Sequence, residues 1–220
     1  MPDPAARRPL SSRDTRWAAR VTRMLAARGA TPNGISQASM IAAAVAGLSF
    51  WALALVPVGA GAAVLLIVAA LGCQIRLLCN LFDGMVAVEA GRGAPDGPLW
   101  NELPDRVSDI LILAGMGLGV GQPALGLFAA CMAVLTAYTR ELGASIGLAP
   151  DFCGPMAKPH RMALVTGAAL LALLETYLVP PGTTLTAALW LIALGSAATT
   201  LRRAHRIRAK LLGATPAETK

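Results

Sequence analysis

The sequence predicts an all-α integral membrane protein, a bundle of six transmembrane helices preceded by an N-terminal interfacial amphipathic helix. Only 14% of the 220 residues are charged and the mean hydropathy is +0.60, whereas soluble domains carry about 25% charged residues. In addition, the stretch between Arg28 and Arg76 contains no charged residue and has room for two spans of about 20 residues each. This composition excludes intrinsic disorder, a disulfide-rich secreted module and a soluble nucleic-acid binder.

Short segments rich in glycine and proline predict the turns between helices. One such turn lies at residues 57–61, and similar turns lie at residues 119–123 and 180–182. Counting outward from these turns gives six predicted spans: 34–56, 62–88, 98–119, 123–147, 159–179 and 183–205.

Basic residues predict the orientation, because Lys and Arg near the ends of spans stay on the cytoplasmic side. All 19 Lys and Arg residues fall on one side of the predicted topology, and the three hairpin turns on the other side contain none. We therefore expect a multi-pass protein of the inner (cytoplasmic) membrane of the cell, with both termini in the cytoplasm.

Residues 1–30 form a basic N-terminal segment without the apolar run of a signal peptide. Within this segment, Trp17, Val21 and Met24 recur at helical spacing among arginines, which predicts an interfacial helix on an anionic lipid surface. A disordered basic leader is the alternative. The six-helix transmembrane domain is expected over residues 31–210, and residues 211–220 form a polar tail.

Ionisable groups at membrane depth are costly, so they mark either a functional site or a paired structural feature. Two spans carry such groups on one helix face, at spacings of three or four residues: Arg76, Asn80 and Asp83 in the second span, and Asn101, Asp105 and Asp109 in the third. Oxygen side chains that converge from two helices suit a hard divalent cation shared with substrate phosphates. Alternatively, Arg76 and Arg106 only neutralise the carboxylates, although the carboxylates and carboxamides outnumber what two arginines can satisfy.

Residues 80–105 read Asn80-x-x-Asp83-Gly84-x-x-Ala87-Val88, then eight residues, then Gly97-x-x-x-Asn101-x-x-x-Asp105. This spacing resembles the signature of the CDP-alcohol phosphotransferase (CDP-alcohol phosphatidyltransferase) family, D-x-x-D-G-x-x-A-R-x(8)-G-x-x-x-D-x-x-x-D. Flanking motifs extend the resemblance over roughly residues 13–205. They are Thr31-Pro32-Asn33 before the first span, Arg140-Glu141 at the end of the fourth, and Lys158-x-His160-Arg161 in place of the family's G-K-x-K-T segment.

The resemblance implies a metal-dependent transferase of phospholipid synthesis. Such an enzyme transfers a phosphoalcohol group, typically a phosphatidyl group, from a CDP-linked lipid donor such as CDP-diacylglycerol to a small alcohol acceptor and releases CMP. A homodimer among membrane lipids, without nucleic acid, is also implied. One or two Mg²⁺ or Mn²⁺ ions would be held by Asn80, Asp83, Asn101 and Asp105, with Asp105 as the catalytic base. The donor would be bound by Gly84, Ala87, Gly97 and Asn33, and the acceptor by Arg140, Lys158, His160 and Arg161.

This chain departs from the signature at three positions, which makes it a divergent member. Asn80 and Asn101 replace the first and third aspartates, and Val88 replaces the arginine. Because each carboxamide removes a negative charge and one coordinating oxygen, we expect a second metal ion to be held weakly or not at all. Residues that could compensate are Glu102, Asp109 and Arg92.

Two other functions are compatible with the same residues. The first is a non-catalytic family member that acts as a lipid- or nucleotide-binding membrane scaffold. The second is a small transporter, which is less favoured because Glu175, expected to be interfacial, is the only ionisable group of the outer half, and an ion path needs a relay across the whole membrane.

Overall fold

The computed structural model describes residues 15–89, 95–175 and 179–213, with the side chains of Glu89 and Asn101 also left outside the description. Within these ranges every regular element is helical, which confirms the predicted all-α fold. The elements are α1 (Arg16–Ala27), α2 (Pro32–Ala52), the short 3₁₀ helix η3 (Leu53–Leu55), α3 (Ala60–Glu89), α4 (Gly97–Gly119), α5 (Pro123–Ser145), α6 (Lys158–Ala172) and α8 (Thr183–Leu211).

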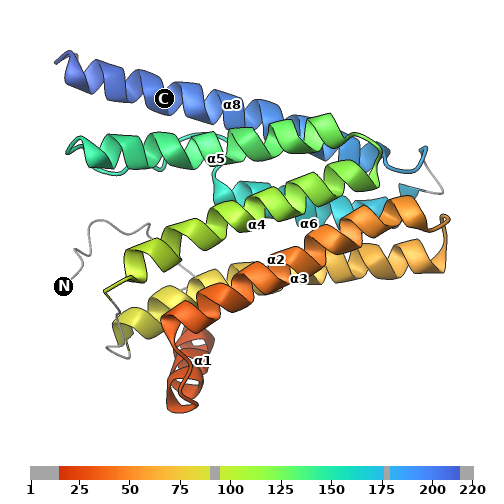
Figure 1. Ribbon diagram of the computed structural model, residues 1–220, viewed down its shortest axis with the longest axis horizontal. Helices are drawn as coiled ribbons and strands as arrows, with labels where there is room; N and C mark the ends of the chain where they lie inside the picture. Colours follow the sequence, from red (N-terminus) through yellow and green to blue (C-terminus); the bar gives the residue numbers. More distant parts are fainter. Residues whose placement is uncertain (1–14, 90–94, 176–178, 214–220) are drawn as a thin grey trace.

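The long helices run side by side along the long axis of the molecule, and α1 projects away from them at one end (Figure 1). Helix α2 packs against both α3 and α4, α5 packs against α4 and α8, and α6 contacts α3 and α8. The turns at residues 56–59, 120–122 and 180–182 lie at the opposite end from α1 (Figure 1). We call these two ends the turn end and the α1 end.

Five of the six predicted spans coincide with helices, whereas α6 (Lys158–Ala172) covers only the first two thirds of the predicted span 159–179. Only four helices of the described part are long and apolar enough to cross a membrane. These four are Pro32–Leu55, Ala60–Val88, Pro123–Ser145 and Thr183–Leu211. Helix α4 has sufficient length, but it carries four charged residues: Glu102, Asp105, Arg106 and Asp109. Helix α6 has 15 residues, about 22 Å at 1.5 Å per residue, whereas the hydrocarbon core is about 30 Å thick. The predicted span 159–179 also includes residues 176–178, which lie outside the described part.

Helix α1 forms where a helix is predicted, and it packs through a face other than that of the apolar residues expected to lie on lipid. Ala18 and Thr22 are buried, whereas Trp17 and Met24 are 48% and 44% exposed. The reason is that α1 packs against α3, and small side chains allow the two backbones to approach closely. Trp17 still contacts α3, since its ring lies edge-on to that of Phe82 with centroids 5.8 Å apart.

Glycines determine how closely α2 and α4 approach each other near the turn end. A Cβ atom on Gly115 would lie 2.1 Å from the backbone oxygen of Gly47, and one on Gly119 would lie 2.0 Å from that of Phe50. Only glycine fits at such distances, so the two backbones are in direct contact. This contact anchors one end of α4, whose other end carries the charged residues.

Glu175 has a structural role that the sequence does not reveal. Its carboxylate is buried and accepts hydrogen bonds from the backbone N–H groups of Gly182, at 2.7 Å, and of Thr184. The first N–H groups of a helix have no partner within the helix, and a negative charge there is favourable. Glu175 therefore caps the start of α8 at the turn end.

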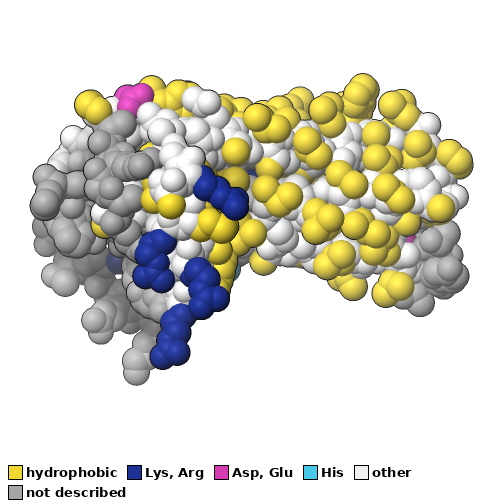
Figure 2. All heavy atoms as spheres, turned by 90° about the horizontal axis from the view of Figure 1, so that it is seen from below, with side chains coloured by type: hydrophobic (Ala, Val, Ile, Leu, Met, Phe, Trp, Pro, Cys, Tyr) yellow, Lys and Arg dark blue, Asp and Glu magenta, His cyan; other side chains and the backbone are white. Residues whose placement is uncertain are grey.

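The outer surface of the helices is largely apolar. Figure 2 shows hydrophobic side chains over most of the visible face, while Lys and Arg gather towards one end. Exposed residues on successive helices include Ile41, Leu48, Val64, Leu71, Leu171 and Leu194, each at least 56% exposed. An apolar surface of this extent is expected for helices that face lipid.

The contact between α2 and α4 predicts the effect of adding one methyl group. Gly115→Ala should destabilise the protein by about 1–3 kcal/mol, since the added Cβ forces the backbones apart, and should lower the midpoint of thermal unfolding in detergent. Gly167→Ala in α6 is the matched control, because nothing lies within 4 Å of its added Cβ. Equal midpoints for the two variants would contradict the proposed backbone contact.

Candidate functional site

Buried charged side chains from α3, α4 and α6 meet within the bundle. Asp83 lies on α3, Asp105 and Asp109 lie on α4, and Arg161 lies on α6. Each of these four residues is less than 9% exposed. The i, i+4 spacing of Asp105 and Asp109 places both carboxylates on one face of α4, as the sequence predicts.

The carboxylate of Asp83 is fixed by two donors. The hydroxyl of Ser36 on α2 donates to Oδ2 at 2.9 Å, and the backbone N–H of Gly84 donates to Oδ1 at 2.5 Å. Ser36 is a site residue that the sequence analysis missed. It lies nearly one helical turn after Asn33, so it shares a face of α2 with a residue already implicated.

Asp105 lies between two cations. Its Oδ2 accepts a hydrogen bond from the Lys158 ammonium at the start of α6, and its Oδ1 is 3.5 Å from Nη2 of Arg76. Oδ1 is buried and has no hydrogen-bond partner. Both carboxylate oxygens therefore face a cation, but only Oδ2 is hydrogen-bonded, and Oδ1 has only the longer ion pair with Arg76.

Arg76 and Arg161 hold Asp109 from both sides. Nη2 of Arg76 donates to Oδ1 of Asp109 at 3.1 Å and to the backbone oxygen of Asp105 at 3.2 Å. Nη2 of Arg161 donates to Oδ2 of Asp109 at 2.5 Å. The alternating charges of Lys158, Asp105, Arg76, Asp109 and Arg161 form a continuous series, which we call the ion ladder.

A second group of charges lies beside the ion ladder and joins α4 to α5. The carboxylate of Glu102 accepts hydrogen bonds from Arg106 and, at 2.5 Å, from Arg140. Arg140 also donates to Glu141 at 2.7 Å, and its guanidinium lies 5.5 Å from the ring centroid of Phe152. Glu102 is thus engaged with arginines.

The start of α2 is linked to the start of α4 through Asp96. The side-chain amide of Asn33 donates to Oδ1 of Asp96 at 3.0 Å, and the indole N–H of Trp100 donates to Oδ2 at 2.9 Å. The hydrogen bond from Asn33 lowers the pKa of the Asp96 carboxyl most, and the hydrogen bond from Trp100 lowers it further. Gly97 follows directly and has open space where a Cβ would project.

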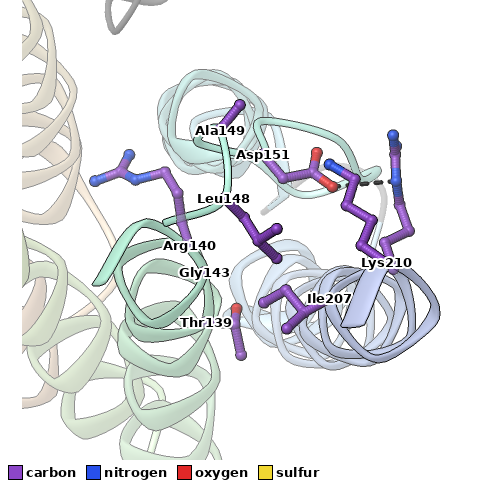
Figure 3. A pocket seen from close by; sticks show the side chains of 9 residues that line it. Thr139, Arg140, Gly143, Leu148, Ala149, Asp151, Ile207 and Lys210 are labelled. Atoms are coloured by element: carbon purple, nitrogen blue, oxygen red, sulfur yellow. Dashed lines mark ion pairs between the residues drawn. The ribbon is translucent and has the colours of Figure 1, made fainter. Parts of the chain in front are cut away.

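A small cavity lies between the ends of α5 and α8 and the loop at residues 146–157 (Figure 3). Asp151 and Arg206 form a 3.2 Å ion pair at this cavity. Its volume of about 10 Å³ is close to the minimum that holds one water molecule. Arg140 points away from it (Figure 3), so the cavity is not a pocket for the acceptor.

The structure separates the predicted acceptor-binding residues. Arg161 is buried in the ion ladder, Lys158 faces Asp105, and Arg140 faces Glu102. His160 is exposed, with Nδ1 3.0 Å from the backbone oxygen of Pro155. Of the residues predicted to compensate for the asparagines, Asp109 belongs to the ion ladder, and Arg92 lies outside the described residues.

The donor set fits one divalent cation. Among the residues that the structure describes, no three His, Cys, Asp or Glu side chains are grouped to hold a metal ion. The remaining carboxylates of the signature, Asp83 on α3 and Asp105 on α4, are both buried within the bundle. Asn80 adds a carboxamide whose buried nitrogen, Nδ2, has no hydrogen-bond partner. Exchanging the amide oxygen and nitrogen would put the oxygen at the position of that nitrogen. Two carboxylates and a carboxamide, completed by phosphate oxygens, suit Mg²⁺.

Comparisons with known proteins agree with the fold and the motif. No family model matches the chain. The phosphatidylinositol phosphate synthase of Mycolicibacterium smegmatis is 30% identical over 191 residues, which cover 82% of this chain and 78% of that protein. A crystal structure of the phosphatidylinositol phosphate synthase of Mycobacterium tuberculosis with CDP-DAG bound has a TM-score of 0.71 at 21% identity, covering 88% of this chain and 94% of that one. The manganese and citrate complex of the same enzyme gives 0.72 at 20% identity, covering 92% of each chain.

The ion ladder predicts a large loss of stability when its central carboxylate is neutralised. Asp109→Asn leaves Arg161 buried without its countercharge and leaves Arg76 with only its 3.5 Å ion pair to Asp105, which should cost roughly 3–5 kcal/mol. Glu141→Gln is the control, since Glu141 is half exposed and exposed ion pairs contribute at most about 1 kcal/mol. Unfolding in detergent, followed by loss of helical circular dichroism, would measure both. Equal stability of the two variants would contradict the ladder.

Proposed function

The chain belongs to the CDP-alcohol phosphatidyltransferase family, and we propose that it transfers the phosphatidyl group of CDP-diacylglycerol to a small acceptor alcohol and releases CMP. The observation that carries the proposal is the pair of carboxylates, Asp83 and Asp105, which are retained with the signature's spacing and are both buried, on α3 and α4 respectively. The curated relative is named a phosphatidylinositol phosphate synthase, and the M. tuberculosis enzyme binds CDP-DAG in its crystal structure.

The reaction is a displacement at phosphorus. The acceptor oxygen bonds to the phosphorus that carries the diacylglycerol, the bond from that phosphorus to the CMP oxygen breaks, and the hydroxyl proton leaves. Bound Mg²⁺ or Mn²⁺ supplies neutralisation of the pyrophosphate charge. Asp83 and Asp105 would hold the cation, and Ser36 would keep Asp83 in position.

Asp105 is the proposed acceptor of the hydroxyl proton. Its buried Oδ1 has no hydrogen-bond partner and therefore has a lone pair available for a proton. Lys158 and Arg76 hold the same carboxylate from two sides, so its orientation is fixed before the substrate arrives. Fixed orientation of this kind supplies much of the rate in reactions that depend on positioning.

The acceptor is proposed to be a small alcohol, and the name of the relatives points to an inositol phosphate. Arg140, Lys158 and Arg161 each face a carboxylate, so an acceptor phosphate would replace one of these ion pairs. His160, which is exposed and has only a backbone partner, would lie at the mouth of the site. Arg161 is assigned instead to the positioning of Asp109.

In the membrane, we propose that residues 31–210 form one domain of six spans, with the charged residues of α4 and α6 paired inside the bundle. The α1 end would face the cytoplasm, since Lys and Arg gather there (Figure 2) and basic residues stay on that side. Helix α1 would lie on the membrane surface, and both termini would be cytoplasmic. A homodimer in the inner membrane is proposed from the family resemblance.

The direct test is turnover by the purified protein. Radiolabelled CDP-diacylglycerol, with Mg²⁺ or Mn²⁺, is incubated with inositol phosphate, glycerol phosphate, inositol, glycerol and serine in turn. We expect metal-dependent CMP release with at least one acceptor. Background CMP release with every acceptor and both metals would instead favour the non-catalytic scaffold.

The two retained carboxylates predict the effect of their removal. Asp83→Ala and Asp105→Ala should each lower the rate of CMP release at least about 100-fold, because a base alone contributes roughly 10²–10⁴-fold. Asp151→Asn is the control, since Asp151 pairs with Arg206 away from these carboxylates and should leave the rate within about twofold. Near-normal turnover in either alanine variant would exclude that carboxylate from the reaction.

The proposed topology predicts which positions a membrane-impermeant thiol reagent can reach in intact cells. In a background without the four native cysteines, Val58→Cys and Gln122→Cys should react from outside. Arg28→Cys and Leu212→Cys should react only after the cells are opened. The opposite pattern would place the site on the outer face, away from cytoplasmic CDP-linked lipids.

A further inference from the structure

The buried charges around the site balance one another within the described residues. Asp105 and Asp109 pair with Arg76, Lys158 and Arg161. Asp83, which Ser36 and Gly84 hold without an ion pair, makes the third carboxylate beside these three cations. The neighbouring group is balanced as well, since Glu102 and Glu141 pair with Arg106 and Arg140. The charges of these described side chains thus cancel before any metal ion or substrate enters.

This neutrality follows from the two asparagines. Aspartates at positions 80 and 101 would add two negative charges, which a resident divalent cation could compensate. With asparagine there, a divalent cation that entered alone would leave two uncompensated positive charges in a buried site, and uncompensated buried charge is strongly unfavourable. Each phosphate of a CDP-linked lipid carries one negative charge, so one divalent cation and one donor together restore neutrality.

Lys158 is placed to supply positive charge beside Asp105, as a second metal ion would. Its ammonium pairs directly with Asp105 and also interacts electrostatically with Asp83. Its side chain keeps 28% exposure, so it can also meet an incoming phosphate. Arg76 is not equivalent, because it is fully buried and fixed between Asp105 and Asp109. A lysine ammonium is a compact point charge on a flexible stem and suits this use.

We propose that Lys158 takes the place of a second divalent cation, and that the site binds one Mg²⁺ or Mn²⁺ per chain only together with the pyrophosphate of the donor. The proposal rests on the proposed function, because it takes a CDP-linked lipid as the donor. It specifies one metal ion per chain, bound only when the donor is also bound.

The test counts bound Mn²⁺ directly. Purified protein in detergent is titrated with Mn²⁺, and the electron paramagnetic resonance signal of free Mn²⁺ is followed with and without CDP-diacylglycerol. Micelles of donor without protein correct for Mn²⁺ that the lipid binds itself. We expect one Mn²⁺ per chain with the donor and at least about tenfold weaker binding without it, within the usual range of coupling between two ligands.

Variants separate the role of Lys158 from that of the asparagines. The triple variant Asn80→Asp, Asn101→Asp, Lys158→Gln should bind Mn²⁺ without donor and bind two ions per chain with donor. Lys210→Gln, which removes a lysine charge near the end of α8, should behave as the wild type. If the triple variant does not fold, the wild-type titration still decides between one ion and two.

Two Mn²⁺ per chain in the wild type, or one ion bound equally well without donor, would overturn the proposal even if CMP is released normally. Conversely, donor-dependent binding of one Mn²⁺ without CMP release would support the proposal and refute the transferase activity. Measuring CMP release in the same preparation therefore distinguishes failure of the inference from failure of the proposed function.

Discussion

The burial of Arg76 is the constraint on which the site depends. Its guanidinium is fully buried in an apolar helix, where an unpaired charge is strongly destabilising. Helix α4 must therefore present carboxylates towards α3, and Asp105 and Asp109 meet that requirement one turn apart. Each carboxylate has a second oxygen to satisfy, and Lys158 and Arg161 supply those partners from α6. One buried cation on α3 thus determines the rotation of α4 and the position of the start of α6.

Helix α4 is also restrained near the turn end, by packing against α2 rather than by charge. Direct backbone contact between α2 and α4 at Gly47 and Gly115 depends on van der Waals packing, which drives helix association where lipid is as apolar as the helices. Because Ser36 on α2 also holds Asp83, the glycine contact and the ion ladder act on one connected unit. A site built on helices held at both ends is well suited to reactions that depend on fixed geometry.

The sequence predicts the helices well, because turns and apolar runs are local signals, and five of the six predicted spans coincide with helices. It also predicts that Asp105 and Asp109 share one face of α4, and both are buried. The partners of these carboxylates could not be predicted, since the pairing of Lys158 with Asp105 depends on how α6 packs against α3 and α4. The contact of α1 with α3 through Ala18 and Thr22 could not be predicted for a related reason, since it depends on tertiary packing. Ser36 lacked any signal except its spacing from Asn33.

The structure also bears on whether the two asparagines mark a decayed enzyme. In a non-catalytic scaffold, each buried polar atom without a partner would destabilise the folded state by roughly 1–3 kcal/mol and serve no function. Oδ1 of Asp105 is such an atom, and Nδ2 of Asn80, at the first position of the signature, is another. Unsatisfied groups of this kind are rare in folded proteins and are expected at functional sites. Such atoms also occur outside the signature, at Ser39 and Ser196 for example, so they do not by themselves mark a site. The ion ladder beside the signature, which holds Asp105 and Asp109 with three cations, favours a site adapted to a new charge balance over one that has lost its function.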